Sequence, residues 1–217
     1  MIATNTDGIA KRWVKYGAVC GLISAGTYMF LNVLINIPGL PIPRIAVRIL
    51  FFSVGVFGVI SVGGLYHLIR KHKECVMLQM ALILSIVAFT LFTLMAVVQE
   101  TSGAFRQEAT IQGAEEVNVD AIWRAVDSVQ LGIDITFDIF YAVTFILYAL
   151  LMYNHPRFGI AFSISGITLF SGLLILNMTT FPHPPGEAGL FDMGPFTGLW
   201  ALAVIVQSLR SVNWMDE

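Results

Sequence analysis

Residues 129–153 read VQLGIDITFDIFYAVTFILYALLMY, an apolar stretch with two acidic and no basic side chains. A helix needs about 20 predominantly apolar residues to cross about 30 Å of hydrocarbon, so this stretch predicts a membrane span. The composition of the chain agrees, because its 217 residues are 57% hydrophobic and only 12% charged. Soluble domains have about 45–50% apolar and about 25% charged residues, and disordered chains are more polar still. We therefore expect an integral membrane protein.

Five further apolar runs have the length of a membrane-spanning helix. With the first stretch they predict six spans, at about 13–37, 45–69, 75–98, 129–153, 158–181 and 195–212. Strands of a membrane barrel would be about 9–11 residues of alternating polarity, and these runs do not alternate. The predicted fold class is all-α, a polytopic helix bundle that forms one membrane domain over residues 1–217. Residues 99–128 are expected to form an outer loop with a short interfacial helix.

The lysines and arginines beside the spans predict the orientation of the chain, because cytoplasmic flanks carry an excess of them. If the N-terminus is inside, eight face the cytoplasm: Lys11, Arg12, Lys15, Arg70, Lys71, Lys73, Arg157 and Arg210. Four then lie on the outer side: Arg44, Arg48, Arg106 and Arg124. This excess predicts that both termini are cytoplasmic.

Small residues recur within the spans, where they let helix backbones approach one another closely. Gly17 and Gly21 form a GxxxG pattern in the first span, and Gly63 and Gly64 lie in the second. We expect these glycines to serve helix packing.

Two carboxylates lie deep in the fourth span. Asp134 and Asp138 are four residues apart and share one helix face, and Gln130 extends this face one turn outward. At 1.5 Å per residue, Asp138 lies on the order of 14 Å below the start of the span, near the middle of the bilayer. Ionisable groups at that depth cost about 2.5–3.5 kcal/mol on insertion scales, so they indicate a functional site.

These carboxylates have three interpretations. They could hold helices together through hydrogen bonds or through pairing with Arg44 or Arg48. They could bind a proton or a cation, or they could act as acid and base in catalysis. Apart from Lys15 at the cytoplasmic end of the first span, the spans hold no lysine, so we expect no Schiff-base cofactor within the membrane.

Other polar side chains are predicted at a similar depth in the outer half: Asn32, Asn36, Gln99, Glu100, Asn177, Thr179 and Thr180. We expect a polar cleft that opens to the outer face. Its predicted ligand or proton site consists of Asp134, Asp138, Gln130, Asn177, Asn32 and Glu100. The alternative is a set of hydrogen bonds between helices with no cleft.

The connection before the last span contains Pro182, Pro184 and Pro185, and Asp192 precedes the start of the predicted helix. An acidic residue there favours the positive end of the helix dipole, so Asp192 is expected to cap the helix. The alternative is an outer-loop lid over the cleft, formed by His183, Asp192 and Trp200.

The C-terminal half resembles a group of uncharacterised bacterial six-helix membrane proteins that carry a domain of unknown function. The resemblance covers about residues 130–212. It rests on the segments FDIF at 137–140, NHPRFG at 154–159, TFPHPP at 180–185, AGL at 188–190, DMGP at 192–195 and GLW at 198–200, with Gly166 and Asn177. It implies the fold and a bacterial origin, and it transfers no activity. Together with the spans, it predicts a multi-pass protein of the bacterial inner (cytoplasmic) membrane.

The sequence contains no serine-hydrolase elbow, P-loop, HExxH or dinucleotide-binding fingerprint. We therefore assign no catalytic residue, metal or cofactor, and we lean against an enzyme. A net charge of −2 with 12 Lys and Arg argues against nucleic-acid binding, which requires a basic face. The expected function is a small-solute or proton-linked transporter or binding protein with an outward-facing polar site.

Two alternatives to a transporter stay open. One is a membrane-embedded enzyme that acts on a lipid or a quinone. The other is an accessory subunit of a membrane complex. The expected partners are membrane lipids, a small solute or proton, and other membrane subunits.

Overall fold

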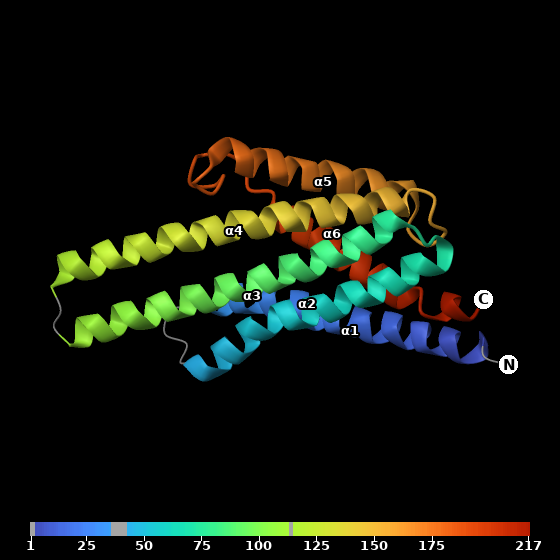
Figure 1. The fold of residues 1–217 in the computed structure, drawn as a ribbon, viewed down its shortest axis with the longest axis horizontal. Helices are drawn as coiled ribbons and strands as arrows, with labels where there is room; N and C mark the ends of the chain where they lie inside the picture. Colours follow the sequence, from blue (N-terminus) through green and yellow to red (C-terminus); the bar gives the residue numbers. More distant parts are fainter. Residues whose placement is uncertain (1–2, 36–42, 113–114) are drawn as a thin grey trace.

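The computed structural model describes residues 3–35, 43–112 and 115–217, and every regular element in them is helical. Figure 1 shows the six long helices lying roughly along one direction, with both ends of the chain at the same end of the bundle. The elements are α1 (Ala3–Ile35), α2 (Arg44–His72), α3 (Val76–Ile111), α4 (Glu116–Met152), α5 (Gly159–Thr180), α6 (Gly194–Arg210) and the short 3-10 helix η1 (Asn213–Asp216). The predicted all-α class is confirmed.

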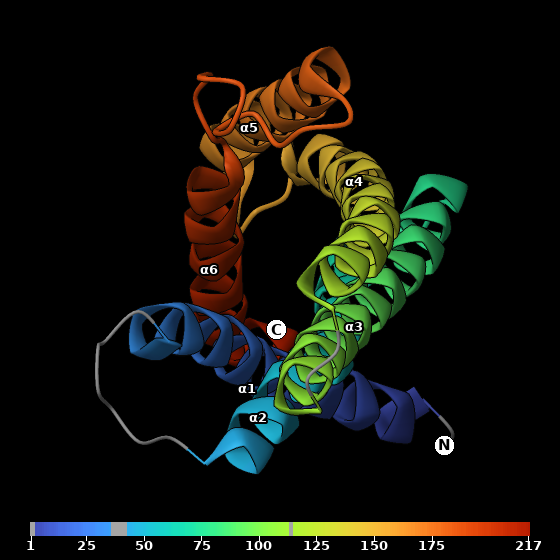
Figure 2. The same ribbon diagram turned by 90° about the vertical axis from the view of Figure 1, so that its left-hand side faces the viewer.

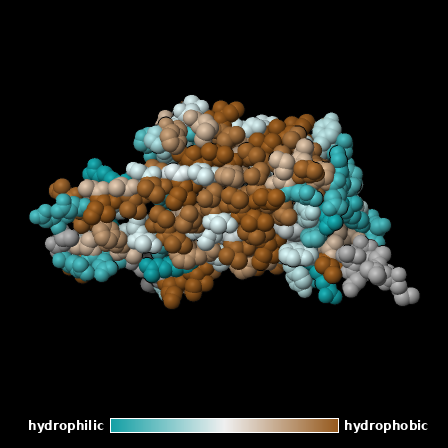
Figure 3. All heavy atoms as spheres, viewed as in Figure 1, coloured by the Kyte–Doolittle hydropathy of each residue, from teal (hydrophilic) through white to brown (hydrophobic). Residues whose placement is uncertain are grey.

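Five helices in the described residues are long and apolar enough to cross a membrane, namely α1 to α5. Figure 3 shows hydrophobic side chains over the middle of the visible face and hydrophilic side chains at both ends, which is the pattern of a membrane-spanning bundle. The remaining helix, α6, has 17 residues, which corresponds to about 26 Å. Asn36, which the sequence places beside the site, lies outside the described residues.

Consecutive helices α1 to α5 pack against one another, and α6 packs against α1 and α5. Viewed along the bundle, the helices therefore surround a central region (Figure 2). This arrangement matters for the site, because side chains from all six helices can point inward.

Close packing between α1 and α2 explains two of the glycines. A Cβ atom on Gly17 would lie 2.6 Å from the Cα of Gly64, and one on Gly64 would lie 2.7 Å from the carbonyl oxygen of Trp13. A larger residue at either position would force the two backbones apart. The prediction of a packing role is confirmed for this pair.

The connection between the third and fourth spans differs from the expected loop at residues 99–128. α3 continues to Ile111 and α4 already begins at Glu116, so the two helices form a long antiparallel hairpin. Arg106 joins them, since its guanidinium pairs with Asp120 at 3.0 Å and lies 4.7 Å from the centroid of the Trp123 ring. At 1.5 Å per residue, the 36 residues of α3 extend about 54 Å, well beyond the hydrocarbon layer. The drop in hydropathy therefore marks the end of lipid contact and not the end of the helix.

The end of the bundle that carries both termini is closed by polar contacts. Lys11 pairs with Asp216, and the Lys71 ammonium donates to the carbonyl oxygen of Trp214 at 2.6 Å. Arg157 Nε donates to Ser211 Oγ at 3.3 Å. These bonds tie α1, α2, the α4–α5 connection and the C-terminal segment together.

His155 lies buried at this end, with 2% of its surface exposed. Its Nδ1 accepts a hydrogen bond from the Arg157 backbone N–H at 3.1 Å, so the proton is on Nε2, which lies 3.5 Å from the Leu68 carbonyl oxygen. Burial lowers the pKa of His155 from its usual 6.5 to about 4. The Leu68 carbonyl opposes this shift, while nearby His72 and Arg157 add to it.

Candidate functional site

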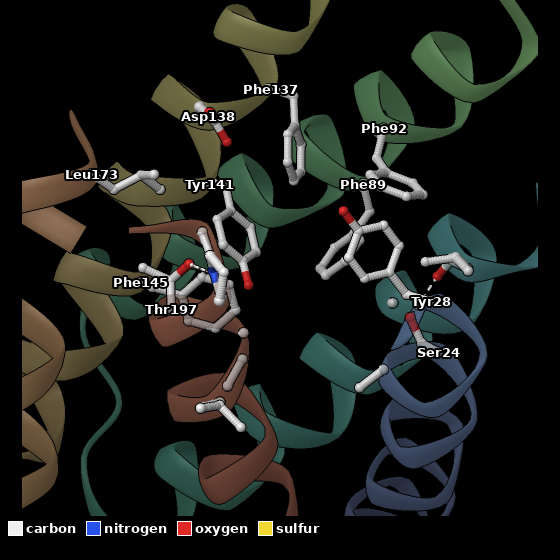
Figure 4. A pocket seen from close by; sticks show the side chains of 18 of the residues that line it. Ser24, Tyr28, Phe89, Phe92, Phe137, Asp138, Tyr141, Phe145, Leu173 and Thr197 are labelled. Carbon is white, nitrogen blue, oxygen red and sulfur yellow. Dashed lines mark hydrogen bonds between the residues drawn. The ribbon is translucent and has the colours of Figure 1, made fainter. Parts of the chain in front are cut away.

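A cavity of about 770 Å³ lies inside the bundle, lined by residues from all six helices and from the connection between α5 and α6. Figure 4 shows Asp138 and Tyr141 from α4 on one side and Ser24 and Tyr28 from α1 on the other. The cavity is large enough for a small organic molecule, because ligand pockets commonly enclose about 300–1,000 Å³.

One face of α4 supplies the centre of the lining, with Asp134, Asp138, Tyr141 and Phe145. Their spacing of four, three and four residues keeps all of them on one side of a helix with 3.6 residues per turn. The sequence therefore places the two carboxylates and the two aromatic rings in a continuous stripe. The carboxylates occupy one end of the stripe and the rings the other.

Asp138 is held by α5. The side-chain amide of Asn177 donates from Nδ2 to Asp138 Oδ2 at 2.6 Å, and Asn177 is 5% exposed. A buried amide that donates to a carboxylate fixes its orientation and satisfies one of its oxygens. This bond is the hydrogen bond between helices that the sequence offered as one interpretation of the polar residues. It exists together with a cavity, and not in place of one.

Asp134 is half-buried and has no hydrogen bond or ion pair with any residue for which the structure describes a side chain. It lies close enough to Asp138 and Asp192 to interact electrostatically with them. All three carboxylates line the same cavity. Like charges repel, so this region favours a bound proton or cation.

Asp192 lies beside the start of α6 and also borders the cavity, while its role in a lid stays a prediction. Its Oδ1 accepts a hydrogen bond from the Gly194 backbone N–H at 2.8 Å, at the first residue of α6. It also lines the cavity, together with Pro182, Pro184 and Pro185 of the same connection. The connection therefore forms part of the cavity wall.

The other two residues assigned to the lid lie elsewhere. His183 is exposed, 4.0 Å from Glu187, and is not among the residues that line the cavity. Trp200 is buried between α5 and α6, where its indole N–H donates to the Phe162 carbonyl at 3.2 Å and to Ser165 Oγ at 3.1 Å. It packs in the core behind the cavity because its ring is surrounded by aromatic side chains of α4 and α5.

Two residues of the predicted site, Glu100 and Gln130, do not line the cavity. Glu100 pairs with Arg48 at 2.9 Å on the surface between α2 and α3. Gln130 is buried in α4 but is not part of the lining. Asn32 belongs to α1, and its side chain is outside the described part of the structure. The pairing of Arg48 with Glu100 also means that Arg48 does not pair with Asp134 or Asp138.

The aromatic lining was missed by the sequence reasoning. Rings from three helices contribute to it: Tyr28, Phe89, Phe92, Phe137, Tyr141 and Phe145. In α4 the signal was present, because Tyr141 and Phe145 continue the face of the two aspartates. For α1 and α3 no such signal exists, since an aromatic residue that faces lipid and one that faces a cavity look the same in a hydropathy pattern.

Comparison with known proteins gives no relative from which a role could be transferred. No protein-family model matches the chain, and neither a curated protein nor a solved structure matches it. The resemblance to uncharacterised bacterial membrane proteins therefore stays a prediction.

Proposed function

We propose that the chain is a small-solute or proton-linked transporter, or a solute-binding protein, whose site is the cavity at Asp134, Asp138 and Asn177. The observation that carries this proposal is the cavity of about 770 Å³ with carboxylates in its wall, inside a bundle of apolar helices. Carboxylates that serve only packing would be enclosed and fully bonded. Asp134 instead borders open space without a partner among the described side chains.

The proposed topology has six crossings, with both termini in the cytoplasm of a bacterium and the chain in its inner membrane. Support comes from the eight Lys and Arg residues on the terminal side against four on the other, and from the termini lying at the same end (Figure 1). In this topology α6 is the sixth span. Its 17 residues are short for a full crossing, which local thinning of the bilayer accommodates. The carboxylates and the connection at 181–193 then face outward.

The two aspartates are suited to coupling a proton to a solute. When Asp138 or Asp134 takes up a proton, the repulsion among the three carboxylates falls, and the preference of the cavity for a positive ligand weakens. When the proton leaves, that preference returns. A solute and a proton that compete for the same carboxylates are the minimal requirement for exchange across a membrane.

The test is uptake by proteoliposomes under an imposed proton gradient. The probe is a mixture of radiolabelled amino acids, sugars, organic acids and organic amines, offered to the wild type and to Asp138→Asn. We expect gradient-dependent uptake by the wild type and its loss in Asp138→Asn. Asp127→Asn is the matched control, because it makes the same change on the same helix at a residue that does not line the cavity.

Two results would overturn the proposal of a transporter whose site includes Asp138. The first is wild-type uptake no greater than that of empty vesicles. The second is full uptake by an Asp138→Asn protein that elutes as a folded monodisperse species.

A further inference from the structure

The cavity joins two chemically different regions. At one end lie three carboxylates, Asp134, Asp138 and Asp192. Next to them lie the rings of six aromatic residues from α1, α3 and α4, several of which are seen around the central space in Figure 4. A ligand that fills this space meets negative charge at one end and apolar, π-rich surface along the rest.

The carboxylates lack a compensating charge in the cavity. None of the residues that line it in the described part of the chain is Lys, Arg or His. Arg48, which the sequence offered as a partner, is already paired with Glu100. A site that keeps negative charge in a poorly solvated space selects a ligand of positive charge.

The residues that line the site argue against a metal ion as that ligand. Within the described residues no group of three or more His, Cys, Asp or Glu side chains lies close enough together to hold one. Hard divalent cations require six or more oxygen ligands at short range, which aromatic walls do not provide. The faces of Phe and Tyr rings do attract organic cations, whose charge is spread over a larger and more weakly hydrated surface.

We infer that the ligand of this cavity is an apolar organic cation, such as an aromatic or alkyl ammonium compound. This inference rests on the proposed function, since it names the solute class of the same site. Asp134 supplies the charge that is free to meet the cation, while the hydrogen bond from Asn177 holds Asp138 in place. The rings of Phe137 and Tyr141 lie with centroids 5.1 Å apart and planes inclined by 31°, and the Phe92 ring meets Phe137 edge to face at 5.5 Å, so the apolar wall is preorganised.

The experiment measures binding, not transport, and uses two ions of the same shape. Radiolabelled tetraphenylphosphonium and tetraphenylborate are equilibrated by dialysis with the full-length protein in detergent, with protein-free micelles as the blank. We expect saturable binding of the cation and no specific binding of the anion. In Asp134→Asn the dissociation constant for the cation rises about tenfold, which corresponds to 1.4 kcal/mol.

Two further variants separate the contribution of the carboxylate to binding from that of the aromatic lining. Phe137→Leu keeps apolar volume but removes a ring face, and it should weaken cation binding about threefold, which is a typical size for one cation–π contact. Asp127→Asn, outside the cavity, should leave binding unchanged. If Asp134→Asn does not fold, the comparison of the two ions on the wild type and on Asp134→Glu, which keeps the charge, decides the question.

The inference is overturned if the anion binds as tightly as the cation, or if folded Asp134→Asn binds the cation like the wild type. It is also overturned, with the transport role intact, if neither ion binds while Asp138-dependent uptake of a neutral or anionic solute is found. Cation binding that follows the expected order, without any gradient-dependent uptake, supports the inference and overturns transport.

Discussion

Polar side chains are paired differently at the end of the bundle that carries the termini and around the cavity. At the end that carries the termini, several charged and polar side chains are bonded to one another, as in the Lys11–Asp216 and Arg157–Ser211 pairs. Around the cavity, three carboxylates share one region with no basic side chain among the described lining residues. Burying a polar group without a partner costs free energy, so a chain under selection for stability alone would not keep this arrangement. The difference supports the proposal that the cavity binds a ligand, while the bonded terminal end contributes to stability.

The largest expected effect is at the terminal end. His155→Ala removes a fully packed ring between the end of α2 and the C-terminal segment, where it contacts His72 and Trp214 at 5.2 and 5.4 Å between centroids. We expect the free energy of unfolding to fall by about 3 kcal/mol, because the substitution leaves a void in the packing and removes a hydrogen bond. It should appear as a lower Tm of the detergent-solubilised protein.

His183→Ala is the matched control for this prediction. The same side chain is removed from an exposed position in the α5–α6 connection, where the Tm should stay within error of the wild type. An equal fall in both variants would contradict the role assigned to His155.

The second prediction concerns acidification of the same end. Because the pKa of His155 is about 4 in the folded state and 6.5 when unfolded, the unfolded state binds more protons between these values. The contribution of the neutral ring is complete above about pH 6.5 and is lost as the pH falls towards 4. Acidification from pH 7 to pH 5 should therefore lower the free energy of unfolding by about 2 kcal/mol. The Tm of the wild type should therefore fall more steeply over this range than that of His155→Gln, and parallel curves would refute the assignment.

The third prediction concerns a residue of the cavity, where the substitution should raise the Tm and not lower it. Asp134→Asn removes a carboxylate that has no partner among the described side chains and is repelled by Asp138 and Asp192. We expect the Tm to rise, by the equivalent of about 1 kcal/mol, while binding or uptake falls. Asp127→Asn should change neither quantity. A fall in Tm on Asp134→Asn would show that Asp134 has a structural role and would remove the contrast between the two ends.

The fold could be predicted from sequence to the extent that lipid contact dictates it. Apolar length identified the regions of α1 to α5, and the i, i+4 relation of Asp134 and Asp138 placed them on one inward face. The extension of α3 and α4 beyond the membrane could not be read from hydropathy, because a helix in water needs intrahelical hydrogen bonds and a partner helix but no apolar run. Arg106, which bridges the two helices, acts across 14 positions of sequence.

The partners of each side chain explain why some residues of the predicted site do not line the cavity. The sequence predicts that Glu100 and Asp138 belong to one site, but Glu100 meets Arg48 of α2 whereas Asp138 meets Asn177 of α5. Which face of one helix meets which face of another depends on the packing of the whole bundle. A single sequence predicts the depth of a side chain in the membrane. It predicts the direction of that side chain around the helix axis only relative to other residues of the same helix, and not relative to the neighbouring helices.

The smallest expected effect tests the same contrast on a single pair. Glu100→Gln breaks the ion pair with Arg48, whose two side chains are 33% and 40% exposed. Because water and salt screen such a pair, we expect a change in Tm equivalent to about 0.5 kcal/mol or less, and none at high salt. Tetraphenylphosphonium binding should be unchanged in Glu100→Gln, since Glu100 does not line the cavity. Weakened binding would place Glu100 in the site after all, and the cavity would then share a carboxylate with the surface between α2 and α3.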